Sequence, residues 1–490
     1  MQRRFMYLIT ILVLVSMTLA ACGSPAATTS ATAIPSLMPA GTQTTAPTKA
    51  ALATTAATTA ATASTAATTA ATTAATTAPT KAATTAATTA AGGSTAIDCM
   101  GATKGDTLVM FYQWSGQEET KLNTILKPLV DACGIVLKPT ATRDQAVLDT
   151  QVKGGTPPDV AFWQITQAVQ YQGQLQAMDT LGGKKENYEQ FFIDQGTVGG
   201  KWLGLPVKLD VKSIIWYSPA VFKAKNYTVP KTWAELNTLV DKMVADGNVP
   251  WSTGLESGAA TGWTGADFIE DILLVQQGPQ YINDIISGKV AYNDAGVKTA
   301  YTTYGKWAKD PKYAIGGAQG TLSTNFNVAI DKVFSDPPQA MMVKQSGFAS
   351  GEILTKYPTL KNGTDFDFFS IPDAKGLQAG YDWMLAFKNT PAVKALVAYL
   401  TSPVGGANWA KASFDLTPNK GGNGQYSDPA LVKKGELLAN AKGVVPSMGD
   451  VIPGGFGNAV WTAIVNFING KDLDTELANA AKIQAAAIKK

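Results

Sequence analysis

Residues 202–217 read WLGLPVKLDVKSIIWY and have the β-branched and aromatic content of a strand, with a turn signal on each side. Lys208, Asp210 and Lys212 occupy every second position, so their side chains project from one face of an otherwise apolar ribbon. A row of charges on a buried strand is costly unless that face meets water or a polar ligand. The pattern therefore predicts either an edge strand with a solvated face or a strand that forms part of a binding site.

The length and charge of the chain limit what this strand can belong to. At 490 residues the chain can hold two large lobes in addition to its tails. Its net charge is only +3, and no basic stripe stands out. A nearly neutral surface is not expected to bind nucleic acid by counterion release, so nucleic acid is excluded as a partner.

The first 22 residues predict an export signal. Arginines at positions 3 and 4 precede a short apolar core over 8–17, and LAAC at 19–22 resembles a bacterial lipobox, in which the cysteine receives the lipid. The alternative is a plain secretory signal cut near Ala21. The apolar run is too short for a comfortable membrane-spanning helix. We therefore expect an exported lipoprotein, anchored through Cys22 to the outer face of the cytoplasmic membrane.

Residues 23–104 follow as a predicted tether. They consist mostly of alanine and threonine up to about position 97, with no apolar side chain large enough to build a core, which predicts disorder. Beyond the lipid-bearing cysteine only Cys99 and Cys133 remain. In an oxidising compartment they form either a disulfide or two buried free thiols. Because the chain has no histidine and no CxxC pair, we expect no metal site.

From about residue 105 the sequence alternates between short strands and helices. Strands are predicted at 108–112, 135–137 and 160–163, and helices at 118–130 and 142–152. This alternation is typical of an α/β domain on a largely parallel sheet, whose ligands bind at the carboxyl ends of the strands. The polar and aromatic residues just after these strands, or at the following helix starts, are Trp114, Gln117, Arg143, Asp144, Trp163 and Gln164.

The second half of the sequence contains an unusual loop. Residues 250–268 place two tryptophans and two acids, Trp251, Glu256, Trp263 and Asp267, among many small residues. Small residues let large rings lie close to the backbone, so we expect a shaped loop rather than core filling. Further strands are predicted at 339–343, 366–372 and 380–387, and helices at 232–245, 294–309, 392–400, 405–412 and, as a terminal pair, after position 454.

The sequence offers little for catalysis. Without histidine there is no Ser-His-Asp arrangement, and the glycine clusters lack the ending of a phosphate-binding loop. Two of five acids could serve a glycosidase: Glu118, Asp210, Glu256, Asp267 and Asp382. Tryptophans instead gather near turns, where indole faces can stack on sugar rings while neighbouring polar groups bind hydroxyls. Any single tryptophan more often fills a core, but as a set they favour carbohydrate binding without cofactor or metal.

Several motifs together resemble a known family. They are WSGQEE at 114–119, TRD at 142–144, GGTPPDV at 154–160, LPVK at 205–208, GLESGAATGW at 254–263, and the segments 267–271 and 453–461. These motifs are similar to those of the extracellular solute-binding proteins (family 1) of bacterial carbohydrate ABC importers. Within that family the 254–271 block is most similar to the α-glucoside-binding branch.

The resemblance implies a two-lobed α/β fold of the type II periplasmic-binding-protein kind, with a ligand cleft between the lobes. The first lobe would comprise 105–209 and about 384–416, and the second lobe 213–380 and about 418–490. Asp210 would bind ligand hydroxyls from the first crossing strand. The remaining residues implied to bind ligand are Trp114, Gln117, Glu118, Arg143, Asp144, Trp163, Gln164, Trp251, Glu256, Trp263, Asp267, Asp382, Trp383 and Trp461.

The resemblance also implies a function and its partners. The protein would be a monomer that captures an α-glucoside or short gluco-oligosaccharide and delivers it to ABC permease subunits, without catalysis. At 381–383 the sequence is YDW, where the family has a glycine-rich run, so the ligand could be another oligosaccharide or a polyol. A surface glycosidase is the rival from another class.

Overall fold

The first sheet begins at Thr107. In the computed structural model, which describes residues 96–489, β1 (Thr107–Tyr112) pairs in parallel with β2 (Val136–Ala141) and β3 (Val160–Trp163). Helices α2 (Gln117–Cys133) and α3 (Gln145–Lys153) connect these strands. The predicted parallel pairing is confirmed for these three strands. The predicted signal, Cys22 and the tether up to residue 95 lie outside the described residues.

Helix α2 is longer than predicted. It continues through Pro128 to Cys133, because its apolar face remains buried beyond the proline. A disulfide then joins Cys133 to Cys99, with 5.5 Å between the Cα atoms, as in the first of the two predicted alternatives. Ile97 and Met100 pack against the same core. The predicted tether boundary at residue 104 is therefore wrong, because residues 96–104 belong to the folded domain.

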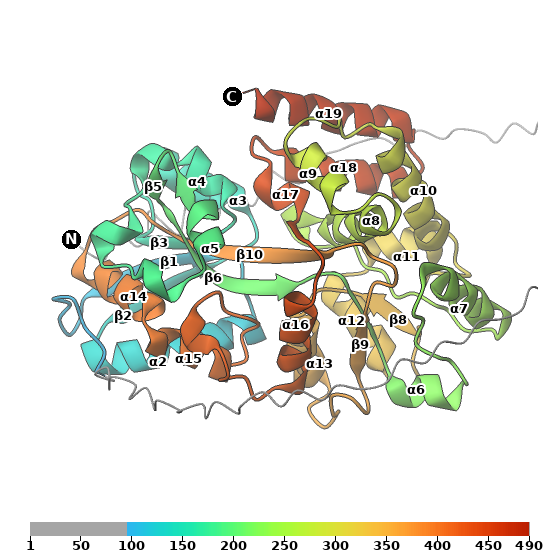
Figure 1. Ribbon diagram of the computed structural model, residues 1–490, viewed down its shortest axis with the longest axis horizontal. Helices are drawn as coiled ribbons and strands as arrows, with labels where there is room; N and C mark the ends of the chain where they lie inside the picture. The colour runs from blue at the N-terminus through green and yellow to red at the C-terminus, as the bar shows by residue number, and fades with distance from the viewer. Residues whose placement is uncertain (1–95, 490) are drawn as a thin grey trace, which may run out of the picture. The chain divides into compact units, whose positions relative to one another are not determined.

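Two strands connect the lobes. β6 (Gly204–Val211) and β10 (Leu377–Ala386) pair antiparallel, with Lys208 opposite Asp382 and Asp210 opposite Gly380. The end of β10 pairs antiparallel with β3, so the first sheet is mixed rather than purely parallel. The beginning of β10 pairs with β11 (Val444–Pro446) on the other side of the molecule. Figure 1 shows β6 and β10 running between the two groups of elements.

The stretch 202–217 contributes to three sheets. β5 (Lys201–Trp202) pairs with β4 (Thr197–Val198), β6 follows, and β7 (Ile214–Tyr217) is the central strand of a second, antiparallel sheet. The flanking strands are β8 (Met342–Lys344) and β9 (Asp367–Ser370). All eight residues of β6 are buried. The alternative of an edge strand with a solvated face is therefore wrong.

The apolar side chains form separate cores on either side of the crossing strands. One core joins residues between positions 108 and 207 with residues between 384 and 414. The largest core joins residues between 215 and 480, and it contains the buried faces of α8 (Trp263–Gln276), α10 (Ala295–Lys309) and α18 (Phe456–Ile468). This is the two-lobed α/β architecture expected from the sequence. The lobe boundaries given above stay a prediction.

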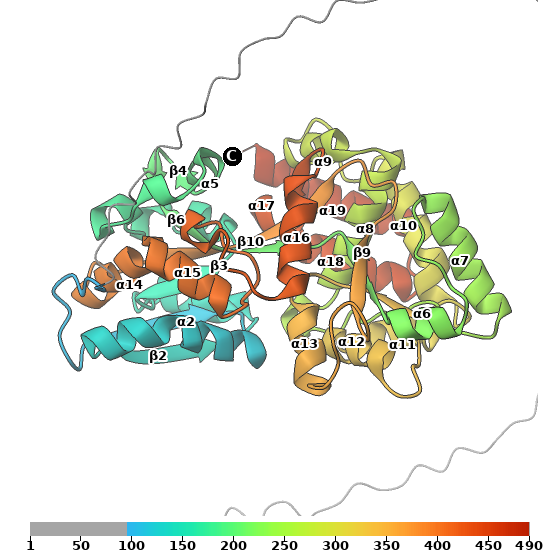
Figure 2. The same cartoon turned by 60° about the horizontal axis from the view of Figure 1, so that its bottom comes forward.

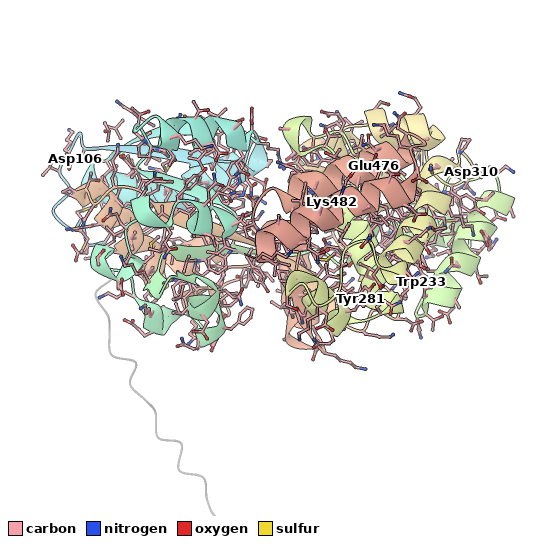
Figure 3. All side chains as sticks on the ribbon, turned by 90° about the horizontal axis from the view of Figure 1, so that it is seen from above. Asp106, Trp233, Tyr281, Asp310, Glu476 and Lys482 are labelled. Carbon is pink, nitrogen blue, oxygen red and sulfur yellow. A yellow bond between two sulfur atoms is a disulfide. The ribbon has the colours of Figure 1, made fainter. Side chains whose placement is uncertain are left out.

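The other helices surround these sheets (Figures 1 and 2). They are α4 (Thr166–Gln170), η1 (Gln172–Gln174), η2 (Met178–Leu181), η3 (Lys185–Asn187), α5 (Gln190–Gln195), α6 (Pro219–Ala224), α7 (Trp233–Ala245), η4 (Gly258–Ala260), α9 (Pro279–Ile286), α11 (Gly317–Ser323), α12 (Phe326–Phe334), α13 (Ala349–Lys356), α14 (Pro391–Thr401), α15 (Pro403–Lys411), η5 (Lys420–Gly422), α16 (Pro429–Ala439), α17 (Met448–Val451) and α19 (Leu473–Ile488). Figure 3 shows α19, with Glu476 and Lys482 labelled, on the outside of the second lobe. Within 96–489 no helix is both long and apolar enough to span a membrane.

Candidate functional site

Lys208 and Asp210 on β6 and Lys212 just after it form the polar row of β6, which lies against carboxylates from both lobes. Lys208 Nζ lies 2.7 Å from Oε1 of Glu118, which begins α2, and 3.7 Å from Oδ2 of Asp382 on β10. Lys212 Nζ lies 3.2 Å from Oδ1 of Asp267 on α8 and 3.3 Å from Oδ2 of Asp450 on α17. Each lysine is thus held by two acids brought from distant parts of the chain.

Burial and neighbouring charges shift the pKa values of these groups. Burial by itself lowers the pKa of Lys208, but Glu118 and Asp382 more than reverse this, so that its pKa lies above the ordinary lysine value. The same holds for Lys212, where burial is outweighed by Asp267 and Asp450. Both lysines therefore stay charged.

The carboxyl groups show the opposite balance. Burial raises the pKa of Asp382 and of Asp450, even though a lysine lies close to each. Glu270, which lies three residues after Asp267 on α8, has a pKa well above its usual range because it is buried and because Asp267 repels its charge. Its carboxyl group accepts hydrogen bonds from Gln378 Nε2 and from the backbone N–H of Met448. Burial thus disfavours the ionised form of several carboxyl groups in the site.

Asp210 is also buried in this arrangement. Its Oδ1 accepts a 2.7 Å hydrogen bond from the backbone N–H of Gly347. Burial, followed by repulsion from neighbouring Asp415, raises the pKa of Asp210 well above its ordinary value. Lys434 of α16 binds Asp415 at 2.7 Å and also donates to the Gly347 carbonyl at 3.1 Å. This network fixes the loop after β8 against the crossing strands.

A cavity of about 120 Å³ extends over this polar floor. Its lining comes from both sides of the crossing strands: Gln113, Trp114, Glu118, Arg143, Gln164, Lys208, Asp210, Lys212, Ala260, Trp263, Ala266, Asp267, Glu270, Ser346, Phe348, Gly380, Tyr381, Asp382, Ser447, Gly449, Asp450 and Trp461. We call this the inner cavity.

A second space, the outer cavity, adjoins the inner cavity. It has a volume of about 800 Å³ and lies between α3 and α4 on one side and α17, α18 and the end of α19 on the other. Gln113, Arg143, Gln164, Asp450 and Trp461 line both cavities, so the two form one continuous cleft. Its size is within the range of roughly 300–1,000 Å³ that is typical of small-molecule sites.

Aromatic side chains line the cleft on each side. On the first lobe, Trp114 Nε1 donates to Asp382 Oδ2 at 3.2 Å, so the indole and the carboxylate orient each other. On the second lobe, Trp263 contacts Phe326 and Phe348, with ring centroids 5.4 and 6.3 Å apart. The guanidinium of Arg143, from the loop after β2, lies 4.9 Å from the centroid of Phe326.

Several buried polar atoms along the inner cavity have no hydrogen-bond partner in the protein. They include Trp263 Nε1, which can only donate, Asp267 Oδ2, which accepts when ionised, and Ser346 Oγ, which can do both. Asp267 and Ser346 are 4% and 2% exposed. Because an unpaired buried polar group costs about 1–3 kcal/mol, these atoms indicate where a bound ligand would form hydrogen bonds.

The structure brings together most of the residues predicted for the site. Those on the inner cavity are Trp114, Glu118, Arg143, Gln164, Asp210, Trp263, Asp267, Asp382 and Trp461. Asp144 and Trp163 line only the outer cavity, and Gln117 lines a smaller pocket beside Glu118 and Lys208.

Three predicted residues lie elsewhere. Trp251 is fully buried in the large core of the second lobe, and Trp383 is 3% exposed and packed in a core of the first lobe. Glu256 lines neither cavity, and its carboxylate accepts from Asn325 Nδ2 and from the backbone N–H of Gly258. The structure does not bring these three side chains to the two cavities, because core packing or local loop bonding engages them.

Other lining residues were missed by the sequence reasoning. Ser346, Phe348, Ser447 and Asp450 come from loops or short helices whose sequences carry no distinguishing pattern. Glu270 could have been found, because Asp267, Glu270 and Asp271 are three acids within an otherwise apolar helical segment. All three are buried, which is rare for acids without a polar site.

Known proteins share this sequence and fold. Residues 133–407 match the model of the family described as bacterial extracellular solute-binding protein. The chain is 33% identical over 397 residues to the alpha-glucosides-binding periplasmic protein AglE of Rhizobium meliloti, a match covering 75% of this chain and 84% of the relative. It is 30% identical over 372 residues to the osmoprotective compounds-binding protein GgtB of a Synechocystis species, covering 73% and 87%.

Among solved structures, a chitin oligosaccharide binding protein has the same fold, with a TM-score of 0.66 at 18% identity over 79% of this chain and 100% of that chain. This likeness concerns the fold alone. The sequence matches cover more than half of the chain and most of each relative. The chain therefore belongs to the bacterial extracellular solute-binding proteins, which bind solutes and are not enzymes.

Proposed function

We propose that this protein captures an α-glucoside or a short gluco-oligosaccharide in the cleft and delivers it to an ABC permease. The observation that carries the proposal is the inner cavity, where aromatic side chains from both lobes surround buried polar atoms that lack partners. A sugar ring offers an apolar face to the aromatics and hydroxyl groups to those atoms. Binding relieves the cost of leaving the atoms unpaired, which favours a hydroxyl-bearing ligand over an analogue without hydroxyls.

The two lobes would close around the sugar. The lining of the inner cavity comes from α2 and β10 on one side and from α8 and the loop after β8 on the other, so a bound sugar would interact best with a closed arrangement. The name of the relative from Rhizobium meliloti supports an α-glucoside as ligand. The name of the Synechocystis relative supports a second candidate, an osmoprotective compound.

The remaining parts of the proposal concern location and assembly. A lipid on Cys22 would anchor the protein to the outer face of the cytoplasmic membrane, with residues 23–95 as a spacer. The protein would act as a monomer that docks on its permease. These parts rest on the lipobox-like sequence and on the family, and labelling with a radioactive fatty acid, lost in Cys22→Ser, tests the anchor.

A thermal-shift panel tests the ligand class. The panel contains maltose, trehalose, sucrose, maltotriose, glucose and glucosylglycerol, each at several concentrations. We expect a concentration-dependent rise of the melting temperature for at least one α-glucoside, because a ligand that binds only the native state stabilises it. A rise with glucosylglycerol alone would favour the osmoprotectant, and no rise with any member would overturn the proposal.

A further inference from the structure

The cleft is acidic although the chain is not. Over all 490 residues the net charge is +3. The inner cavity is lined by six acids, Glu118, Asp210, Asp267, Glu270, Asp382 and Asp450, and by only three bases. The outer cavity adds Asp144 and Asp149 and shares Arg143 and Asp450 with the inner one. The excess of acids is therefore specific to the cleft.

The three basic side chains of the inner cavity already interact with other groups of the protein. Lys208 and Lys212 each lie between two carboxylates at distances of 2.7 to 3.7 Å. Arg143 stacks on Phe326 of the opposite lobe. Within residues 96–489, no other lysine or arginine lines either cavity. An anionic ligand group would thus have to compete with the protein's own carboxylates for these cations.

Two of the unpaired buried atoms also favour a neutral ligand. Asp267 and Ser346 both line the inner cavity, and Asp267 Oδ2, an acceptor, and Ser346 Oγ, a donor or acceptor, have no partner in the protein. A neutral sugar hydroxyl can donate a hydrogen bond to a carboxylate without placing a second negative charge beside it. A phosphate or carboxylate at the same place cannot donate when ionised, and it adds repulsion that grows as water is excluded on closure.

We propose that the cleft selects its ligand by charge, admitting uncharged saccharides and excluding the same saccharides once they bear a phosphate or a carboxylate. This inference rests on the proposed function and narrows its ligand class. The excluding element is the ring of carboxylates formed by Glu118, Asp267, Asp382 and Asp450 at the inner cavity and by Asp144 and Asp149 at the outer one. Like charges placed together across an interface are a repulsive determinant of specificity. The protein would thereby leave phosphorylated sugars and uronic acids outside the cell to other transport systems.

Matched ligand pairs test the inference by calorimetry on the full chain. The pairs are trehalose with trehalose 6-phosphate and methyl α-glucoside with methyl α-glucuronide, and maltotriose serves as a neutral control for added bulk. We expect the anionic member of each pair to bind at least about 100-fold more weakly than the neutral one, equivalent to about 2.8 kcal/mol. Anionic members that bind within about ten-fold of the neutral ones would overturn the charge selection while leaving saccharide binding intact. Absence of binding by all of these ligands would overturn both proposals.

A variant links the selectivity to the carboxylates. Asp450→Asn removes one negative charge that lines both cavities, while Lys212 keeps its contact with Asp267. We expect the ratio between neutral and anionic affinity to shrink by about three-fold or more at low salt. Glu186→Gln removes an exposed charge from η3, away from the cleft lining, and should leave the ratio unchanged. An unchanged ratio in Asp450→Asn would contradict the assignment of selectivity to this ring.

Discussion

Replacing Asp267 by asparagine tests the assignment of the ligand-binding atoms most sharply. Oδ1 of Asp267 already accepts from Lys212 Nζ at 3.2 Å and from Ser447 Oγ at 3.0 Å, whereas Oδ2 of this cavity-lining residue has no partner. Asparagine has the same shape and can keep both bonds through its single oxygen. Its amide nitrogen would then take the place of Oδ2 and present a donor to the ligand instead of an acceptor.

The magnitude follows from the loss of one hydrogen bond to a charged group. Such bonds contribute about 1.5–3 kcal/mol, which corresponds to an affinity roughly 10- to 150-fold weaker. Isothermal titration calorimetry with the best-binding disaccharide measures this directly. Unfolding followed by circular dichroism should show that the variant still folds, with a melting temperature somewhat below that of the wild type, since the mostly buried Lys212 loses one charged partner but keeps Asp450.

The matched control is Asp474→Asn on α19. Asp474 is an exposed acid whose side chain pairs only with the half-exposed Lys298 at the surface, so its substitution should change neither affinity nor stability appreciably. If Asp267→Asn binds sugar within about three-fold of the wild type, Oδ2 does not contact the ligand, and the argument from unpaired buried atoms is wrong.

Three further predictions address the rest of the structure. Trp251→Ala should lower the free energy of unfolding by about 3–5 kcal/mol, because Trp251 is fully buried, yet leave the affinity of the folded protein unchanged by calorimetry; weakened binding would instead place it in the site. Cys99→Ser should cost about 2–4 kcal/mol of stability, since it opens a loop with a sequence separation of 34, and reducing agent should lower the melting temperature of the wild type but not of the variant. Burial raises the pKa of Glu270 well above its ordinary value of 4.5. As pH rises, Glu270 therefore loses its proton in the unfolded chain before it does so in the folded protein. The free energy of unfolding should fall as pH rises from about 4.5 through the pKa of the folded state. Glutamine at position 270 does not titrate. The melting temperature of Glu270→Gln should therefore rise relative to that of the wild type between pH 4 and pH 8, and a constant difference would contradict the raised pKa of Glu270.

Local patterns in the sequence were enough for many elements but not for α8, whose first residues fall in the stretch 250–268 that was expected to be a loop. Strands and helices could be predicted where apolar spacing and capping residues act within a few positions, as at Thr232, whose hydroxyl caps α7 by accepting from the backbone N–H of Glu235. The pairing of β10 with β3 and β6 could not be predicted, because these strands lie far apart in the chain. The mixed sheet therefore became visible only in the structure.

The candidate site was only partly predictable for a related reason. Tryptophans near turns suggested sugar stacking, yet the sequence could not tell Trp263, which lines the cavity, from Trp251, which fills a core. The difference depends on which elements pack over each ring, and α10 places Trp307 against Trp251, with 5.3 Å between ring centroids. Ser346 could not be predicted from the sequence, because only the structure shows that its hydroxyl is unpaired and that the residue lines the inner cavity.

The structure gives the polar row of β6 a role in holding other residues, whereas the sequence predicted direct ligand binding by Asp210. Asp210 was predicted to bind the ligand directly, and it does line the inner cavity. Its Oδ1 is nevertheless engaged by Gly347, and Lys208 and Lys212 each hold acids from two separate elements. The row thus organises the floor of the cleft as well as lining it.

A crystal structure of the protein with a bound α-linked glucose disaccharide, such as maltose or trehalose, tests the central claim most directly. The account predicts a single disaccharide, with its glycosidic bond intact, in the inner cavity, one ring against Trp263 or Trp461 and hydroxyl groups bonded to Asp267 Oδ2 and Ser346 Oγ. Sugar density away from these residues, or a cleft that stays empty at saturating sugar, would contradict it.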